Sequence, residues 1–313
     1  MAGYSQAAGD MSGVTATGEA LVRRVLVWLN PSAGPERRET SPTALTRLFR
    51  QAGCWAEVLV PRSAEEVDRR ARAIEGLDAI VAAGGDGTIN RAAQVALALG
   101  RPLGVLPLGT RNHFAGALGL PTSVDEAVRV VAKGRIVAVD VGEVNGRVFL
   151  NNASLGIYPK IVRFRERDER RGWPRWTAFA WAILTVLRRH PLVDVTLRID
   201  GESVRRRTPF VVVSNNLYDP GGPGLAARDS LRGARLGLYL LRSPTRSALL
   251  RLALDAVLGR VERNRDVETT AAEEIAIETR HRLAGVALDG EPLALETPLR
   301  CRIRPGALRV IVD

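Results

Sequence analysis

The sequence predicts an α/β protein in which an N-terminal domain with a parallel sheet precedes a mostly antiparallel β-sandwich domain. Two observations support this prediction. Strand-like and helix-like segments alternate with short connections through residues 22–136, which is typical of a parallel sheet covered by helices on both faces. From residue 137 onward, most segments alternate apolar and polar positions instead, as antiparallel strands with one buried face do.

The N-terminal domain is expected to contain four strands and four helices. Short apolar runs predict the strands, and apolar residues at helical spacing predict the helices. The strands are expected at residues 25–29, 55–60, 79–83 and 103–106, and the helices at about 40–52, 63–75, 88–99 and 123–133.

The C-terminal domain is expected over residues 137–304. Two helical stretches interrupt its strand pattern, an insertion at 160–190 and a second helix at 245–264. The expected strands are 137–141, 148–150, 193–197, 210–213, 236–241, 275–278, 286–288 and 299–304.

Composition fits a folded, two-domain cytoplasmic protein. The chain has 313 residues, and each predicted domain is large enough to bury a core. Its only two cysteines, Cys54 and Cys301, lie far apart, which argues against a disulfide scaffold or a zinc cluster. Residues 1–21 are rich in small and polar residues and lack an apolar core. We expect them to be a disordered leader, neither a signal peptide nor a transmembrane span.

The most informative motif is Gly84-Gly85-Asp86-Gly87-Thr88, which follows the apolar run at 79–83 and opens a helical pattern. A glycine turn between a strand and a helix presents backbone N–H groups and a positive dipole end to phosphate. Glycines also permit positive φ and let a ligand approach closely. A carboxylate at Asp86 suits such a site if it acts through a cation, usually Mg²⁺. The alternative is an ordinary βα turn in which Asp86 caps the helix.

Two further predicted strands end in similar turns. The strand at 25–29 runs into Asn30 and the segment that follows it, and the strand at 103–106 runs into the segment 107–115. In a parallel sheet such turns gather along the carboxyl edge, where ligands bind. We therefore expect Asn30, Gly109, Thr110 and Asn112 to lie near the glycine motif and to contact a nucleotide, although capping the turns is an alternative role.

Five motifs follow one another along the chain: Asn-Pro-Ser-Ala-Gly at 30–34, Gly-Gly-Asp-Gly-Thr at 84–88, Pro-Leu-Gly-Thr-Arg-Asn-His-Phe-Ala at 107–115, Asn151-x-x-Ser154-x-Gly156 and Asp289-Gly290-Glu291. In this order they resemble the soluble diacylglycerol kinase family, which includes sphingosine, ceramide and bacterial lipid kinases. The resemblance covers about residues 22–313. It implies a kinase that uses ATP and Mg²⁺ and phosphorylates a lipid hydroxyl, with a fold similar to the NAD and diacylglycerol kinases. It also suggests that a terminal strand near 305–313 returns to the first domain.

The resemblance also implies roles for acidic residues. Asp289 would accept the proton of the lipid hydroxyl, and Glu291 would orient the hydroxyl or help to hold metal. Asp86 and Asp140 would belong to an Asp–water–Mg²⁺ network. Asp200-Gly201-Glu202 repeats the same three letters, but its place in the chain does not match the family order, so we interpret it as a hairpin turn.

A membrane contact is expected within residues 160–190. This segment carries nine basic and three acidic residues, and Trp176 to Leu187 form an apolar run too short to span a bilayer. Such a helix suits a membrane interface, and a helix packed on the sandwich is an equal alternative. The residues expected to touch lipid are Trp173, Trp176, Trp181, Arg170 and Arg171.

Charge and composition narrow the choice of partner. The net charge of +11 favours an anionic membrane surface, whereas the aromatic content of 5% is low for a nucleic-acid binder. We expect a cytoplasmic protein peripherally associated with the inner face of the membrane. The sequence leaves open whether the protein forms a homodimer. Two other functions also remain: a soluble-substrate kinase of the NAD kinase type, and a catalytically weakened regulator that binds nucleotide or lipid. The sequence does not identify the acceptor lipid.

Overall fold

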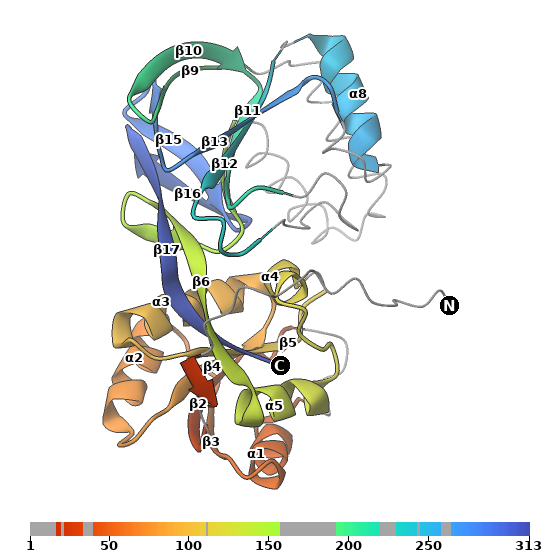
Figure 1. Ribbon diagram of the computed structural model, residues 1–313, viewed down its shortest axis with the longest axis vertical. Coiled ribbons are helices and arrows are strands. Elements are labelled where there is room, and N and C mark those ends of the chain that lie inside the picture. The colour runs from red at the N-terminus through yellow and green to blue at the C-terminus, as the bar shows by residue number, and fades with distance from the viewer. Residues whose placement is uncertain are drawn as a thin grey trace. The chain divides into compact units, whose positions relative to one another are not determined.

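The computed structural model describes residues 17–19, 22–33, 40–110, 112–156, 192–218, 230–242, 245–257 and 264–313. The chain divides into two compact units, unit 1 (Met1–Val139 with Leu308–Asp313) and unit 2 (Asp140–Ala307). Unit 1 is an α/β structure and unit 2 an antiparallel sandwich, which confirms the predicted fold class (Figure 1). The division between the units falls three residues after the expected boundary.

Unit 1 is built on a parallel sheet with the strand order β3-β2-β4-β5-β17. The long strand β17 joins the edge of this sheet by pairing Val310 with Leu103 in parallel. The order of the other strands follows from the pairing of β2 with both β3 and β4, and of β4 with β5. Their bounds are β2 (Arg24–Leu29), β3 (Trp55–Leu59), β4 (Ala79–Gly84), β5 (Leu103–Pro107) and β17 (Leu299–Val312).

Helices cover this sheet (Figure 1). All six residues of β4 are buried, as expected for a strand with both faces covered. The helices are α1 (Pro42–Gln51), α2 (Ala64–Ala73), α3 (Asp86–Leu99), α4 (His113–Ala117) and α5 (Val124–Lys133). The first helix packs on β3 and α5, α3 packs on β4, and α2 packs on α3. The short helix α4 is not predicted by the sequence, because five residues are too few to show helical periodicity.

Part of the leader is ordered. Residues Thr17–Glu19 form strand β1, which pairs antiparallel with β6 (Arg135–Val144), with Thr17 opposite Ile136. The expectation of disorder is wrong for these three residues, because backbone pairing to an edge strand needs no apolar pattern in the sequence. The remainder of the leader lies outside the described residues.

Unit 2 contains two antiparallel sheets. One has the order β10-β9-β14-β17 and the other the order β13-β12-β11-β8-β15-β16, while β6 pairs with β7 and β17. The strands are β7 (Arg147–Phe149), β8 (Asn152–Gly156), β9 (Val193–Ile199), β10 (Glu202–Thr208), β11 (Phe210–Asn215), β12 (Leu236–Leu241), β13 (Val267–Ala272), β14 (Glu274–Thr279), β15 (Leu283–Leu288) and β16 (Glu291–Glu296).

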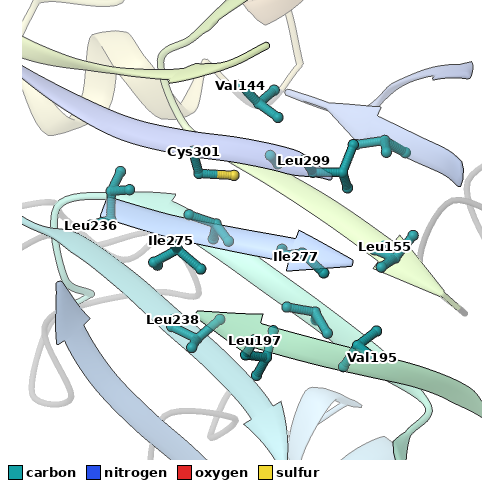
Figure 2. Close-up of a cluster of buried hydrophobic side chains, with 14 of the residues drawn as sticks. Val144, Leu155, Val195, Leu197, Leu236, Leu238, Ile275, Ile277, Leu299 and Cys301 are labelled. Atoms are coloured by element: carbon teal, nitrogen blue, oxygen red, sulfur yellow. The ribbon is translucent and has the colours of Figure 1, made fainter. Parts of the chain in front are cut away.

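The core of unit 2 lies between these sheets (Figure 2). Every second residue of β9 and β14 points inward, so that Val195, Leu197, Ile275 and Ile277 are almost completely buried. Leu238 of the opposite sheet belongs to the same cluster. This period of two is the pattern that predicted a half-buried sheet.

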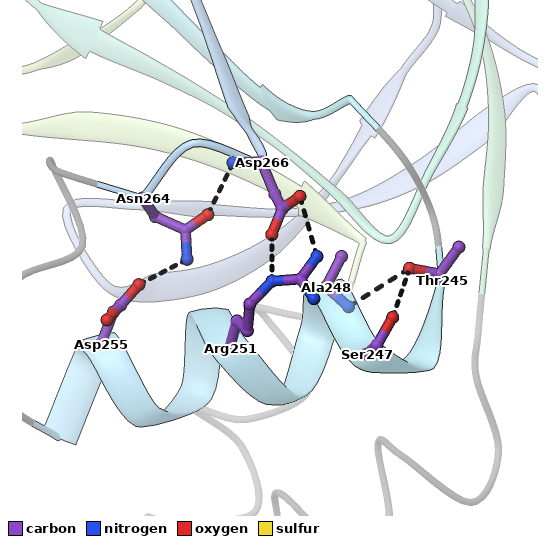
Figure 3. A network of polar contacts seen from close by, with 7 residues as sticks. All are labelled: Thr245, Ser247, Ala248, Arg251, Asp255, Asn264 and Asp266. Atoms are coloured by element: carbon purple, nitrogen blue, oxygen red, sulfur yellow. Dashed lines mark hydrogen bonds and ion pairs between the residues drawn. The ribbon is translucent and has the colours of Figure 1, made fainter.

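Helix α8 (Arg246–Val257) packs on the end of β12 through Ala248 and Leu249. Arg251 donates two hydrogen bonds to Asp266, and Asn264 Nδ2 donates to Asp255 (Figure 3). The described part of the expected helix at 245–264 ends at Val257, and Asn264 itself is not helical: its side chain accepts the Asp266 N–H in a turn. The predicted 160–190 helix lies outside the described residues.

Candidate active site

The three turns singled out by the sequence lie side by side in unit 1. Strands β2, β4 and β5 are neighbours and parallel, so their carboxyl ends meet at one edge of the sheet. Asn30 follows β2, Gly85 follows β4 and Gly109 lies in the turn after β5. The backbone N–H of Asn30 donates to Ala83 O at 2.9 Å, and that of Leu108 donates to Gly84 O at 3.1 Å. The arrangement is a ligand-binding edge typical of open α/β sheets.

Helix α3 opens at this edge. Its N-cap is Gly85, and no side chain caps the first turn. The first backbone hydrogen bond within the helix runs from Ile89 N to Gly85 O at 3.0 Å. The N–H groups of Asp86, Gly87 and Thr88 therefore have no partner within the helix. Together with the helix dipole they form an anion-binding end.

The glycines at this edge allow close approach and do not adopt positive φ. None of Gly84, Gly85, Gly87 and Gly109 has a positive φ, so the conformational freedom of glycine is not used here, whereas the close approach that glycine permits is. A Cβ on Gly84 would lie 2.6 Å from Thr88 Oγ1, and a Cβ on Gly109 would lie 2.5 Å from Gly85 Cα. The chain needs glycine here because two turns and a helix start are packed against one another.

Asn30 contacts both its own turn and α3. Its Oδ1 accepts the Ser32 N–H at 3.0 Å, and its Nδ2 donates to Thr88 Oγ1 at 3.2 Å. Thr88 is 6% exposed. Asn30 therefore caps its turn, as in the alternative role, and also holds the first turn of α3.

Asn112 closes the turn after β5. Its φ of 48° is left-handed, and its Nδ2 donates to Pro107 O at 3.1 Å and Gly109 O at 2.7 Å. These two bonds fix the orientation of the amide. Among the described residues no group donates to its Oδ1, and this atom is buried inside the turn. Thr110 is exposed in the same turn.

Asp86 connects the second turn to the third. Its carboxylate oxygens accept the backbone N–H groups of His113 and Phe114, each at 3.3 Å. These long bonds place the carboxylate at the start of α4, where the helix dipole stabilises negative charge. Asp86 thus caps a neighbouring helix, not the helix α3 that the alternative reading named.

Asp289 is held by the backbone of unit 2. Its Oδ2 accepts the Leu150 N–H at 2.8 Å, and its Oδ1 accepts the N–H groups of Asn151 at 2.7 Å and Asn152 at 2.9 Å. Its own N–H donates to Asn152 O at 2.8 Å. Three backbone donors stabilise the ionised carboxylate and fix it at the turn between β15 and β16.

The repeated motif folds in the same way at both of its positions. Asp289 and Gly290 have φ of 47° and 90°, and Asp200 and Gly201 have φ of 45° and 96°. Asp200 Oδ1 accepts two backbone N–H groups, from Glu273 and Glu274, each at 3.1 Å. Both motifs are therefore hairpin turns with a capping aspartate, and their surroundings differ. Asp200 is exposed, whereas Asp289 is half-buried.

Asp140 is buried in unit 2. Its carboxylate accepts the N–H groups of Ala234 and Gly306, each at 2.8 Å, and the residue is 2% exposed. These contacts account for its burial without a metal ion. Glu291 opens β16 and is exposed. Within the described ranges, no group of three or more His, Cys, Asp or Glu could hold a metal ion.

Two asparagines near Asp289 in unit 2, Asn152 and Asn215, are residues that the sequence did not assign. Asn215 is fully buried, and its Nδ2 donates to Asp140 O at 2.9 Å and Leu150 O at 3.0 Å. Asn152 Nδ2 donates to Tyr218 Oη at 3.0 Å. The available signal is the pair of Asn-Asn dipeptides, at 151–152 and at 215–216. The five residues predicted to touch a membrane lie outside the described residues.

Comparison with known families assigns the chain to the kinases. Residues 24–144 match the family described as the diacylglycerol kinase catalytic domain. Residues 156–312 match the YegS C-terminal NAD kinase beta sandwich-like domain. The chain belongs to this family of diacylglycerol kinases and YegS-like proteins, and it is a lipid kinase. This confirms the resemblance found in the sequence motifs.

Individual relatives agree with this assignment. The chain is 27% identical over 275 residues to the diacylglycerol kinase of Bacillus subtilis, covering 86% of this chain and 90% of the relative. It is 34% identical over 245 residues to the "Probable lipid kinase YegS-like" of Serratia proteamaculans, covering 74% and 78%. A crystal structure of a diacylglycerol kinase from Bacillus anthracis shares the fold, with a TM-score of 0.67, 21% identity, and coverage of 93% and 97%. In the part of the chain that the structure describes, no helix is long and apolar enough to cross a membrane.

Proposed function

We propose that this lipid kinase transfers the γ-phosphate of ATP, with Mg²⁺, to the hydroxyl of a membrane lipid of the diacylglycerol class. The observation that carries the proposal is the N-terminus of α3, which opens without a side-chain cap where the ends of β2, β4 and β5 meet. The names of the relatives support a glycerolipid acceptor, with ceramide and sphingoid bases as alternatives.

In this proposal the first-turn N–H groups of α3 hold the nucleotide phosphates. The Thr88 hydroxyl adds a contact, and Asn30 keeps this turn in place. Gly84, Gly85 and Gly109 keep the space beside the phosphates free of side chains. Thr110 is exposed at the same edge, in the turn that Asn112 holds closed through Pro107 O and Gly109 O. Preorganised N–H groups suit phosphoryl transfer because negative charge stays on the phosphate oxygens throughout the reaction.

The metal ion fits one of the predicted acids better than the other. Mg²⁺ in kinases needs only one or two carboxylates, because substrate phosphates and water supply the other ligands. Asp86 stands beside the phosphate-binding turn and keeps lone pairs beyond its two long backbone bonds. When bound, Mg²⁺ would neutralise charge on the β- and γ-phosphates. Asp140 has both oxygens on backbone N–H groups, so we propose for it only an indirect role through water.

Asp289 is the proposed base. Its carboxylate accepts the proton of the lipid hydroxyl while the hydroxyl oxygen attacks the γ-phosphorus. The bond from that phosphorus to the β–γ bridging oxygen breaks, and ADP leaves. Glu291, on the other side of the same turn, would orient the acceptor. A membrane lipid as acceptor implies peripheral association with the inner face of the membrane, and the net charge of +11 suits an anionic surface.

The test is phosphate transfer from labelled ATP to lipids in mixed micelles, with and without Mg²⁺. The panel contains diacylglycerol, monoacylglycerol, ceramide, sphingosine and phosphatidylglycerol, with NAD as a lipid-free substrate. Asp289→Asn runs beside Asp200→Asn, which changes the same motif at the exposed turn. Labelled lipid that requires Mg²⁺ and is lost only in Asp289→Asn supports the proposal. Labelled NAD, or ATP binding without transfer to any lipid, would overturn it.

A further inference from the structure

The position of the Asp289 carboxylate depends on a short stretch of backbone. Its three N–H donors belong to consecutive residues, Leu150, Asn151 and Asn152, called here the 150–152 segment. Strand β7 ends at Phe149, directly before this segment, and β8 begins at Asn152, the last residue of the segment. A displacement of the segment would therefore move the carboxylate with it.

Strand β11 holds this segment by its backbone and by a buried amide. The Asn215 N–H donates to Asn151 O at 3.0 Å, and the Asn215 Nδ2 donates to Leu150 O at 3.0 Å. The same Nδ2 donates to Asp140 O at 2.9 Å. One fully buried amide group thus joins the strand that carries Asp140 to the segment that binds Asp289.

The orientation of that amide is fixed by its two donated bonds. Among the described residues, nothing donates to Asn215 Oδ1, although the atom is buried. A buried acceptor without a partner costs free energy, so packing alone does not explain an asparagine at this position. The two bonds from Nδ2 do explain it, because a carboxylate there would face two carbonyl oxygens.

Tyr218 holds the segment from its other end. Its Oη accepts a hydrogen bond from Asn152 Nδ2 at 3.0 Å, and its N–H donates to Tyr239 Oη at 2.8 Å. The two tyrosine rings also pack together, with centroids 5.3 Å apart. Asn152 consequently contacts Asp289 through its backbone and Tyr218 through its side chain.

We propose that Asn215 and Tyr218 are positioning residues of this kinase, which fix the 150–152 segment and through it the Asp289 carboxylate. The proposal rests on the proposed role of Asp289 as the base. A phosphoryl acceptor must meet the base at hydrogen-bond distance, and a displacement of about 1 Å can cost on the order of a hundredfold in rate. Neither residue touches the reacting atoms in this proposal.

The test uses Tyr218→Phe, which keeps the ring and removes only the hydroxyl. Its matched control is Thr208→Val, which also removes a hydroxyl without changing shape. Thr208 lies just before β11, at the end opposite Asn215, and its buried hydroxyl bonds to Phe210 O and to the Leu241 N–H. The control therefore reports what the loss of a buried hydroxyl does to unit 2 at a position away from Asp289.

Two readouts separate positioning from general loss of stability. We expect Tyr218→Phe to lower kcat about tenfold with KM for ATP nearly unchanged, and to speed amide hydrogen exchange at residues 150–152. Thr208→Val should lower the melting temperature without either effect. Unchanged exchange at 150–152 in Tyr218→Phe overturns the proposal. If the wild-type protein phosphorylates no lipid, the proposed function fails, while faster exchange in Tyr218→Phe still supports the positioning contact.

Discussion

Replacing Asp289 by asparagine should reduce both activity and stability, and the structure separates the two effects. The asparagine can keep one oxygen on the N–H groups of Asn151 and Asn152, but its NH₂ group then faces the Leu150 N–H. One hydrogen bond to a charged acceptor is lost, and the two that remain become neutral ones. A charge-assisted bond contributes about 1.5–3 kcal/mol, and neutral bonds are roughly half as strong. We therefore expect a destabilisation of about 3 kcal/mol.

For a unit of this size, 1 kcal/mol shifts the melting temperature by about 2–4 °C, so calorimetry should show a fall of about 6–12 °C for unit 2. Loss of the base should lower kcat by about 10²–10⁴-fold. Asp200→Asn is the control, because Asp200 uses a single oxygen for both of its bonds and is exposed. Its effect on stability should be about 0.5 kcal/mol. Equal melting temperatures for Asp289→Asn and the wild type would refute the reasoning about the three donors.

The other predictions concern the phosphate-binding edge and the cysteines. Gly84→Ala should destabilise unit 1 by about 1–3 kcal/mol in thermal melts, because its Cβ would lie 2.6 Å from Thr88 Oγ1; an unchanged melt would contradict the close packing. Thr88→Val should lower the free energy of unfolding of unit 1 by about 1 kcal/mol and raise KM for ATP several-fold, because Asn30 Nδ2 loses its acceptor. Burial raises the pKa of the Cys54 thiol to about 11, with a smaller contribution from a nearby carboxylate, and burial raises that of Cys301 to about 12. A thiol in the unfolded chain ionises near pH 9.0. The contribution of the buried thiols to the free energy of unfolding should therefore be fully present below that pH and be lost as pH rises from about 9 to 12. Free energies of unfolding from urea titrations at pH 8 and pH 10 should differ less in Cys301→Ala than in the wild type.

The sequence predicts the framework of unit 1 well, because its strands and helices depend on local periodicity. The expected strand at 79–83 is β4, extended by one residue, and the turns after β2, β4 and β5 gather at one edge as the parallel order requires. The start of α3 is less well predicted, since it begins at Asp86 and not at Thr88. Glycine in the first turn has low helix propensity, and the packing of Gly84 against Thr88 outweighs that preference.

The environment of each acid cannot be read from the sequence in the same way. Asp289 binds N–H groups 137 to 139 residues away, and Asp140 binds that of Gly306, 166 residues away. These contacts exist only once the strands of unit 2 have paired. Local sequence does not even distinguish Asp289 from Asp200, whose turns have nearly the same backbone angles.

The long strand β17 belongs to both units, and this has a consequence for synthesis on the ribosome. Its residues 308–312 complete the sheet of unit 1, yet all of unit 2, residues 140–307, is translated before them. At about 5–20 residues per second, this delay lasts roughly 10–30 seconds. During that time β5, a strand whose residues are all buried in the finished protein, has no neighbour on the side that β17 later covers. Until residues 308–312 emerge, the nascent chain thus exposes an apolar strand edge, a feature to which chaperones bind.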